Sequence, residues 1–119
     1  MAGEPAFFEI GVEDPERGKT FYGALFGWEF EATGGGHRIA TEGAPGGMHG
    51  GDKGAVPWVF FRVDDMDAAL ARLEELGGAV VVMHEGETES AESIALHGRF
   101  KWCRDDQGSA FGLHQPPAA

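Results

Sequence analysis

Apolar and polar residues alternate along residues 7–13, the pattern of a β-strand with one apolar face. Asp14 and Pro15 follow and predict a helix start. The Asp side chain can accept the free N–H groups of the first turn, and Pro at the first helical position lacks only an N–H that would have had no partner. Apolar residues then recur on one helical face, at Phe21, Tyr22, Leu25 and Phe26. Gly27 predicts the end of this helix.

The first half of the chain continues with short strands. We expect strands at residues 28–31, 37–41 and around 47–49, with the Gly34-Gly35-Gly36 run as a hairpin connection and residues 52–56 as a linker.

The second half repeats this order. A shift of 51 residues places Phe7 on Trp58 and Asp14 on Asp65. The pattern predicts a strand at residues 57–63, a helix at 66–76 ended by Gly77-Gly78, a strand at 79–83 and a final hairpin of 100–104 and 109–114. Residues 84–97 have no period and are expected to form a surface loop with a poorly defined strand inside it.

A strand–helix–strand–strand–strand unit thus occurs twice, which favours an α+β fold of tandem βαβββ modules. We expect one domain over residues 1–119, with module one at about 6–51 and module two at about 57–115. Two curved mixed sheets, each covered by its helix on one face, would form a cleft between their other faces.

The strand residues expected to face away from the helices form an unusual set: Phe7, Glu9 and Gly11, with Trp58, Phe60 and Arg62. A face that met only water would be small and polar. Aromatic residues beside a few polar groups are typical of a small-molecule pocket. Trp102 and His114 are further candidates for this lining.

The charge balance narrows the range of partners. Nine Lys and Arg stand against twenty Asp and Glu, a formal net charge of −11. Without a basic stripe, this balance argues against nucleic acid or an anionic membrane as a partner. The lone Cys103 cannot form an internal disulfide, the first residues do not resemble a signal peptide, and no apolar run is long enough for a membrane span. We therefore expect a cytoplasmic protein.

Three segments carry a resemblance to a known family. They read F-E-I-x-V-x-D-x-x-R-x-x-x-F-Y-x-x-L-F-G-W from Phe8 to Trp28, V-D-D-M-D-A-A-L-A-R-L-E-E-L-G-G from Val63 to Gly78, and R-D-D-Q-G-S-A-F-G-L-H-Q from Arg104 to Gln115. With them the chain resembles the vicinal oxygen chelate superfamily of glyoxalases, extradiol dioxygenases and bleomycin-resistance proteins. The resemblance implies the glyoxalase/bleomycin-resistance-like fold and, as is common in this superfamily, a homodimer.

Metal-dependent members of that superfamily bind a divalent ion through His and Glu on four strands. The resemblance places these ligand positions on Phe7, Trp58 and Gly112, and on His49 at best for the fourth. Phe, Trp and Gly cannot coordinate a metal. The departure implies the non-metal, ligand-binding branch, with no cofactor. A displaced metal site of Glu9, His49 and His114 is the alternative.

Two interpretations of the candidate residues stay open. Glu9 is the best candidate for a general base or ligand acceptor, but an ion pair with Arg62 or another base would also explain it. The aromatic residues could stack on a planar ligand or fill the core. Arg62 could bind an anionic group or be paired within the protein.

Three functions follow as hypotheses. The first is metal-free binding of a small molecule for sequestration, resistance or sensing, with Phe7, Glu9, Trp58, Phe60, Arg62, Trp102 and His114 as the ligand-binding set. The second is a glyoxalase-like lyase or isomerase, or a dioxygenase, that uses the displaced metal site. The third is a module that serves only as an interaction partner, with its aromatic residues packed on one another.

Overall fold

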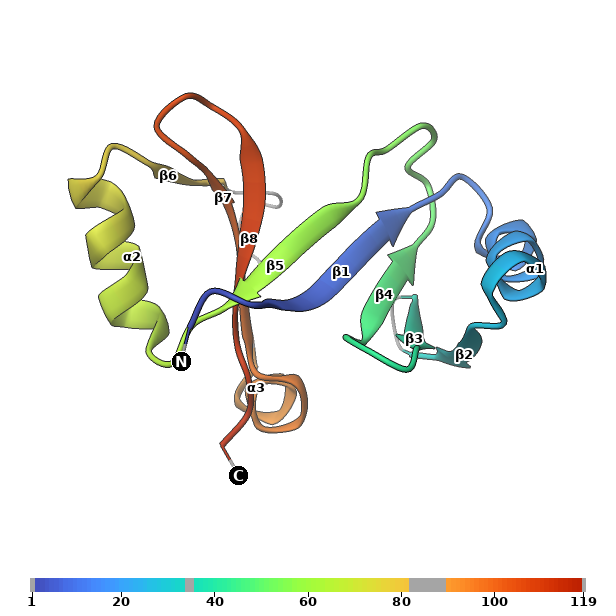
Figure 1. Ribbon diagram of the computed structural model, residues 1–119. Coiled ribbons are helices and arrows are strands. Elements are labelled where there is room, and N and C mark those ends of the chain that lie inside the picture. The colour runs from blue at the N-terminus through green and yellow to red at the C-terminus, as the bar shows by residue number, and fades with distance from the viewer. Residues whose placement is uncertain (1, 34–35, 82–89, 119) are drawn as a thin grey trace. The chain divides into compact units, whose positions relative to one another are not determined.

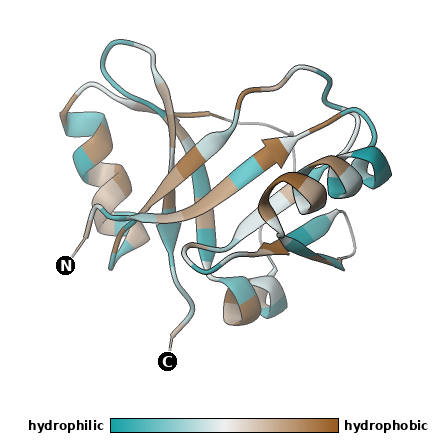
Figure 2. Cartoon of the chain, turned by 45° about the vertical axis from the view of Figure 1, so that its right-hand side comes forward, coloured by the Kyte–Doolittle hydropathy of each residue, from teal (hydrophilic) through white to brown (hydrophobic). Residues whose placement is uncertain are grey.

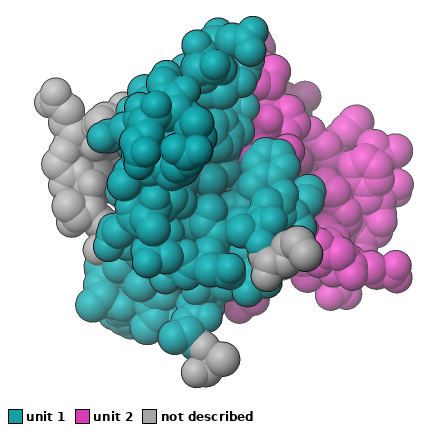
Figure 3. Space-filling view, turned by 60° about the vertical axis from the view of Figure 1, so that its left-hand side comes forward, with its two compact units in different colours: residues 1–5, 60–119 teal, residues 6–59 magenta. Residues whose placement is uncertain are grey.

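The computed structural model describes residues 2–33, 36–81 and 90–118. The chain forms two compact units (Figures 1 and 3). We call residues 6–59 the N-terminal unit and residues 1–5 with 60–119 the C-terminal unit. Each unit contains the βαβββ order predicted from the sequence, so the α+β repeat is confirmed.

The strands of the N-terminal unit follow the order β2-β3-β4-β1. Their bounds are β1 Pro5–Gly11, β2 Glu29–Ala32, β3 His37–Ala40 and β4 Gly46–His49, and helix α1 spans Pro15–Phe26. β1 and β4 pair in parallel, whereas β3 is antiparallel to both β2 and β4. Figure 2 shows that β1 is mostly hydrophobic, with a hydrophilic band near its end.

The C-terminal unit repeats this topology with the order β5-β8-β7-β6. The bounds are β5 Trp58–Arg62, β6 Ala79–Val81, β7 Arg99–Arg104 and β8 Ala110–Gln115, with helix α2 at Met66–Glu75. β5 and β8 pair in parallel, as β1 and β4 do, and β7 is antiparallel to β8 and to β6. The first two residues of β5 belong to the N-terminal unit.

The helix ends agree with the sequence. Asp14 caps α1, and its Oδ1 accepts from the backbone N–H of Glu16 at 3.0 Å. Asp65 caps α2 through Oδ1, which accepts from the N–H of Ala68 at 3.1 Å. Gly27 ends α1 with a left-handed backbone at φ 74°, a conformation that glycine adopts without the steric cost of a side chain.

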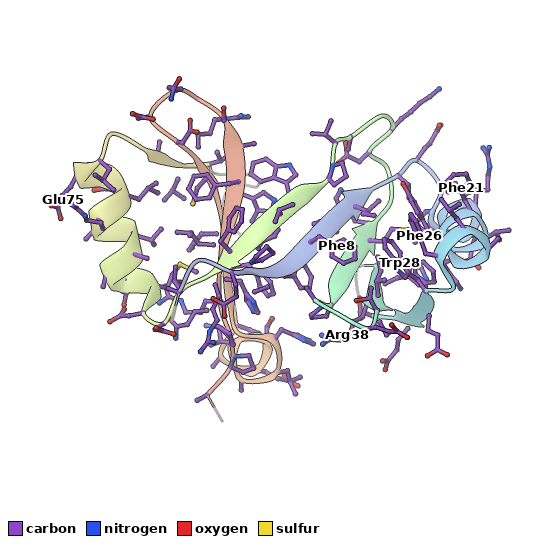
Figure 4. The ribbon with its side chains drawn as sticks, viewed as in Figure 1. Phe8, Phe21, Phe26, Trp28, Arg38 and Glu75 are labelled. Carbon is purple, nitrogen blue, oxygen red and sulfur yellow. The ribbon has the colours of Figure 1, made fainter. Side chains whose placement is uncertain are left out.

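The core of the N-terminal unit lies between α1 and the sheet. Its buried residues are Ile10, Ile39 and Met48, and aromatic residues pack around them. The rings of Tyr22 and Trp28 stack with centroids 5.6 Å apart. Figure 4 shows Phe26, the last residue of α1, next to Trp28, and their ring centroids are 4.7 Å apart.

The predicted apolar face of α1 is only partly buried. Tyr22 is half-buried, but Phe21, Leu25 and Phe26 are more than half exposed. The helix instead approaches the sheet over Gly18, where an added Cβ would lie 2.9 Å from the sulfur of Met48. A search for apolar periodicity does not detect Gly18, because glycine has no apolar side chain.

The C-terminal unit has a buried core of Met66, Cys103 and Leu113, to which residues of α2 add. Burial raises the pKa of the Cys103 thiol to about 11. This thiol is therefore a packing group rather than a nucleophile at neutral pH.

The prediction of a loop over residues 84–97 is wrong for its last part, because Ala91–His97 forms helix α3. Ser90 caps this helix by accepting from the N–H of Ser93 at 3.0 Å. The helix has no buried residue, so it left no apolar period in the sequence. The expected features at Gly34, Gly35 and residues 82–89, including His84, lie outside the described residues.

None of the helices in the described part of the chain has both the length and the apolar character needed to cross a membrane.

Candidate functional site

The parallel pairing of β1 and β4 puts a polar cluster on the face of the sheet away from the core. Glu9 lies opposite Gly47, and Gly11 lies opposite His49. Paired residues share a face and successive residues alternate. Because Ile10 and Met48 point into the core, Glu9 and His49 lie together on the other face.

Glu9, His49 and Asp52 form a continuous chain of contacts, which we call the Glu9–His49–Asp52 cluster. His49 Nδ1 lies 2.6 Å from Glu9 Oε2, and His49 Nε2 lies 2.8 Å from Asp52 Oδ2. When both carboxylates are ionised they can only accept, so both ring nitrogens must donate. The imidazole is then protonated and lies between two negative charges.

Two glycines provide the space for this cluster. A Cβ at Gly11 would lie 2.6 Å from Asp52 Oδ2 and 2.8 Å from His49 Nε2. A Cβ at Gly47 would overlap Glu9 Oε1 and would lie 3.2 Å from Phe7 Cζ. Any larger residue at either position would displace the cluster, so these glycines are required by close approach rather than by a special backbone angle.

Glu9 is the most enclosed member of the cluster. Its side chain is 16% exposed, against 40% for His49. Burial raises the pKa of Glu9 above its ordinary value of 4.5, although the hydrogen bond and charge of His49 oppose this change. For His49, burial lowers the pKa, but the contacts with Glu9 and Asp52 outweigh it and leave the pKa above the ordinary 6.5. The cluster therefore holds a proton more tightly than its separate groups would.

The raised pKa of His49 predicts how the free energy of unfolding changes with pH. A group whose pKa is raised in the folded state stabilises the fold below its ordinary pKa, and this contribution is lost as the pH rises through the folded pKa. For His49 the loss begins above 6.5. We expect His49→Asn to flatten the decline in unfolding free energy above that pH, as measured by urea denaturation across a pH series. An equally steep decline in the variant would contradict the assignment.

The cluster does not fit a divalent metal ion. Both nitrogens of His49 already face carboxylate oxygens, so neither is directed at a point that Glu9 and Asp52 could share. Over residues 2–33, 36–81 and 90–118, no three His, Cys, Asp or Glu side chains are grouped so as to hold a metal. Of the predicted displaced metal site, Glu9 and His49 are in contact within the N-terminal unit, whereas His114 belongs to the C-terminal unit, and a metal site of all three stays a prediction.

The other candidate residues are divided between the two units. Phe7, Glu9 and half-buried Trp58 belong to the N-terminal unit, and Phe60, Arg62, Trp102 and His114 to the C-terminal unit. Glu9 contacts His49, whereas the Arg62 guanidinium lies 3.4 Å from Glu4 and 3.3 Å from Asp64. Both residues thus have charged neighbours within the protein.

The candidates of the C-terminal unit pack closely. Phe60 is fully buried, and its ring meets those of Phe100 and Trp102 edge to face, with centroids 5.6 and 5.0 Å apart. His114 is also buried, stacks on Phe100 at 4.2 Å and has Nε2 2.9 Å from the carbonyl oxygen of His97. A role for these residues in ligand binding stays a prediction.

Sequence reasoning missed two residues of the N-terminal unit. Asp52 lies in the segment assigned to a linker, although its position three residues after His49 was a usable signal. Arg38 lies in β3 on the face that Gly47 and Glu9 share, because it pairs with Gly47. The alternation with its buried neighbour Ile39 could have placed Arg38 outside the core.

Comparisons with known proteins agree with this fold. Residues 7–114 match the model of the Glyoxalase-like domain family. The chain is 29% identical over 132 residues to "Putative glyoxylase CFP32" of Mycobacterium tuberculosis, covering 95% of this chain and 46% of that protein. It is 28% identical to the "Anthracycline biosynthesis protein DnrV" of Streptomyces peucetius, covering 93% and 46%. The chain thus spans less than half the length of these curated relatives.

Solved structures show the same fold at low sequence identity. Methylmalonyl-CoA epimerase from Mycobacterium tuberculosis superposes with a TM-score of 0.64 and 21% identity, covering 97% of this chain and 89% of that one. A variant of homoprotocatechuate 2,3-dioxygenase from B. fuscum gives 0.63 and 18%, covering 98% and 33%. These likenesses concern the fold alone. Because the family model covers nearly the whole chain, the protein belongs to the glyoxalase-like domain family of the vicinal oxygen chelate superfamily.

Proposed function

We propose that this glyoxalase-like protein binds a small organic molecule without a divalent metal ion, on the face of β1 and β4 that carries Glu9 and His49. The observation that carries the proposal is the mostly buried Glu9 carboxylate, which has one oxygen bound to His49 and the other directed over Gly47. A partly desolvated acceptor beside an aromatic ring is typical of a ligand site. Phe7 supplies that ring.

The metal-free part of the proposal is supported by the chemistry of the available donors. The superfamily's ligand positions fall on Phe7, Trp58 and Gly112, which offer no side-chain donor to a metal ion. His49, at the remaining position, has both nitrogens in contact with carboxylates.

Metal analysis and ligand binding together test the proposal. We expect the protein, purified without a histidine tag, to contain far less than one divalent ion per chain by plasma mass spectrometry. We also expect members of a broad ligand panel to raise its melting temperature, because a ligand that binds the folded state stabilises it by mass action. These shifts should shrink in Glu9→Gln. A stoichiometric metal, or a panel without a single shift, would overturn the proposal.

The second candidate is a glyoxalase-like lyase or isomerase, or a dioxygenase, with a metal held by Glu9, His49 and His114. Two of the three residues already lie together, although a metal would have to replace the 2.6 Å contact between Glu9 and His49. Loss of a bound metal in Glu9→Gln and His49→Ala would support this candidate over the first.

A further inference from the structure

Three paired residues form a row across β3, β4 and β1. Arg38 pairs with Gly47, and Gly47 pairs with Glu9. Residues paired across strands share a face of the sheet, so the row lies on the face of the Glu9–His49–Asp52 cluster. Figure 4 shows Arg38 on the side of the strands away from α1.

The two ends of the row are oppositely charged residues, and each can take a further polar partner within the N-terminal unit. Arg38 is exposed. Its guanidinium forms no hydrogen bond or ion pair with residues 6–33 or 36–59. This includes Glu31, the residue of β2 that lies opposite Arg38 in the sheet. Over the same residues, Glu9 accepts one hydrogen bond, at Oε2 from His49, so Oε1 has capacity to accept another.

The Glu9 carboxylate fills the space that a side chain at Gly47 would take, because a Cβ there would overlap Glu9 Oε1. The tip of the Phe7 ring lies 3.2 Å from the same position. Neighbouring strands lie about 4.8 Å apart, so the backbones of Arg38 and Glu9 are separated by roughly 10 Å. Glu9 Oε1 lies over Gly47, inside this span, so a ligand built on a single ring can reach from it to Arg38.

We propose that this row binds a planar organic anion that also carries a hydrogen-bond donor. Arg38 pairs with the anionic group, a carboxylate being the best match to the two-pronged guanidinium. Glu9 Oε1 accepts from a hydroxyl or N–H of the ligand, and the planar body lies beside Phe7. The proposal rests on the proposed function and gives the chemical class of its ligand.

The charges around Glu9 favour a neutral donor over a cationic one. When protonated, His49 carries a positive charge 2.6 Å from Glu9 Oε2, and it would repel a ligand ammonium group. A hydroxyl meets no such repulsion and still satisfies the free lone pairs of Oε1.

Calorimetry with three related probes tests the assignment. 4-Hydroxybenzoate has both the anion and the donor, its methyl ester lacks the anion, and 4-methoxybenzoate lacks the donor. We expect 4-hydroxybenzoate to bind best. Arg38→Gln should weaken it about tenfold or more and abolish its advantage over the ester, since a charge-assisted pair is worth at least that factor. Glu9→Gln should abolish its advantage over the methoxy probe.

Arg17→Gln is the matched control, because Arg17 is an exposed arginine of α1 in the same unit. It removes the same charge and should leave all three affinities unchanged. An equal loss of affinity for 4-hydroxybenzoate in Arg17→Gln and Arg38→Gln would overturn the proposal, because it would show a general effect of charge. A different result would overturn this inference and leave the proposed function intact. In that case, panel ligands bind with an affinity that depends on Glu9 but depends neither on Arg38 nor on an anionic group of the ligand. A panel without binding would overturn both.

Discussion

Phe60→Ala is expected to lower the free energy of unfolding by about 3–5 kcal/mol, the usual cost of removing a buried aromatic ring. Phe60 is 0% exposed and packs edge to face against Phe100 and Trp102. It also covers Gly112, where an added Cβ would overlap the ring. Shrinking Phe60 therefore leaves a cavity beside Phe100, Trp102 and Gly112, and the cost depends on how far these neighbours relax into it. Since domains of this size are stable by only about 5–15 kcal/mol, the loss would be a large share of the total.

Urea denaturation followed by circular dichroism would measure this loss. Val59→Ala is the control, because Val59 precedes Phe60 in β5 but is 40% exposed. It should cost less than about 1 kcal/mol. If Phe60→Ala cost no more than Val59→Ala, Phe60 would not be a core residue, and the sequence-based prediction of a ligand contact would gain weight.

Gly47→Ala is expected to disconnect the Glu9–His49–Asp52 cluster while the chain stays folded. The new methyl group would occupy the place of Glu9 Oε1. A carboxylate at the end of a flexible side chain can rotate away, so the change should displace Glu9 more than it strains the strand. Without this contact His49 loses a hydrogen bond that raises its pKa, which should fall toward 6.5. Ligand affinity should fall about tenfold or more, as for loss of a charged hydrogen-bond partner.

Proton NMR titration of His49 measures the first effect and calorimetry the second. Gly43→Ala is a matched control, because a Cβ there would meet only Thr41 Oγ1, at 3.9 Å. It should change neither quantity. An unchanged His49 pKa in Gly47→Ala would mean that Glu9 keeps its place, and the role given to Gly47 would be wrong.

Local rules in the sequence accounted for most of the fold. Asp14 and Asp65 cap α1 and α2 as predicted, since a short acceptor before an amphipathic run satisfies the free N–H groups of the first turn. Helix α3 was missed because it buries no residue and its seven residues are too few to show a period. The exposure of Phe21 was missed as well, because α1 meets the sheet over Gly18.

The sequence likewise predicted one part of the candidate site and missed another. Alternation along β1 placed Glu9 on the outer face, because strand geometry fixes facing within a strand. It could not supply the partner of Glu9, since His49 is 40 residues away in sequence. A one-residue change of register would have sent His49 into the core.

The sequence by itself determined the repeated βαβββ order, the helix caps and the face on which Glu9 lies, because each depends on residues within one turn or one strand. The tertiary structure decided which of these residues meet. The parallel register of β1 and β4 joins Glu9 to His49, and the pairing of β3 with β4 brings Arg38 into the same row. Such contacts depend on pairing between distant segments, which is set by the packing of the whole unit and not by local preference.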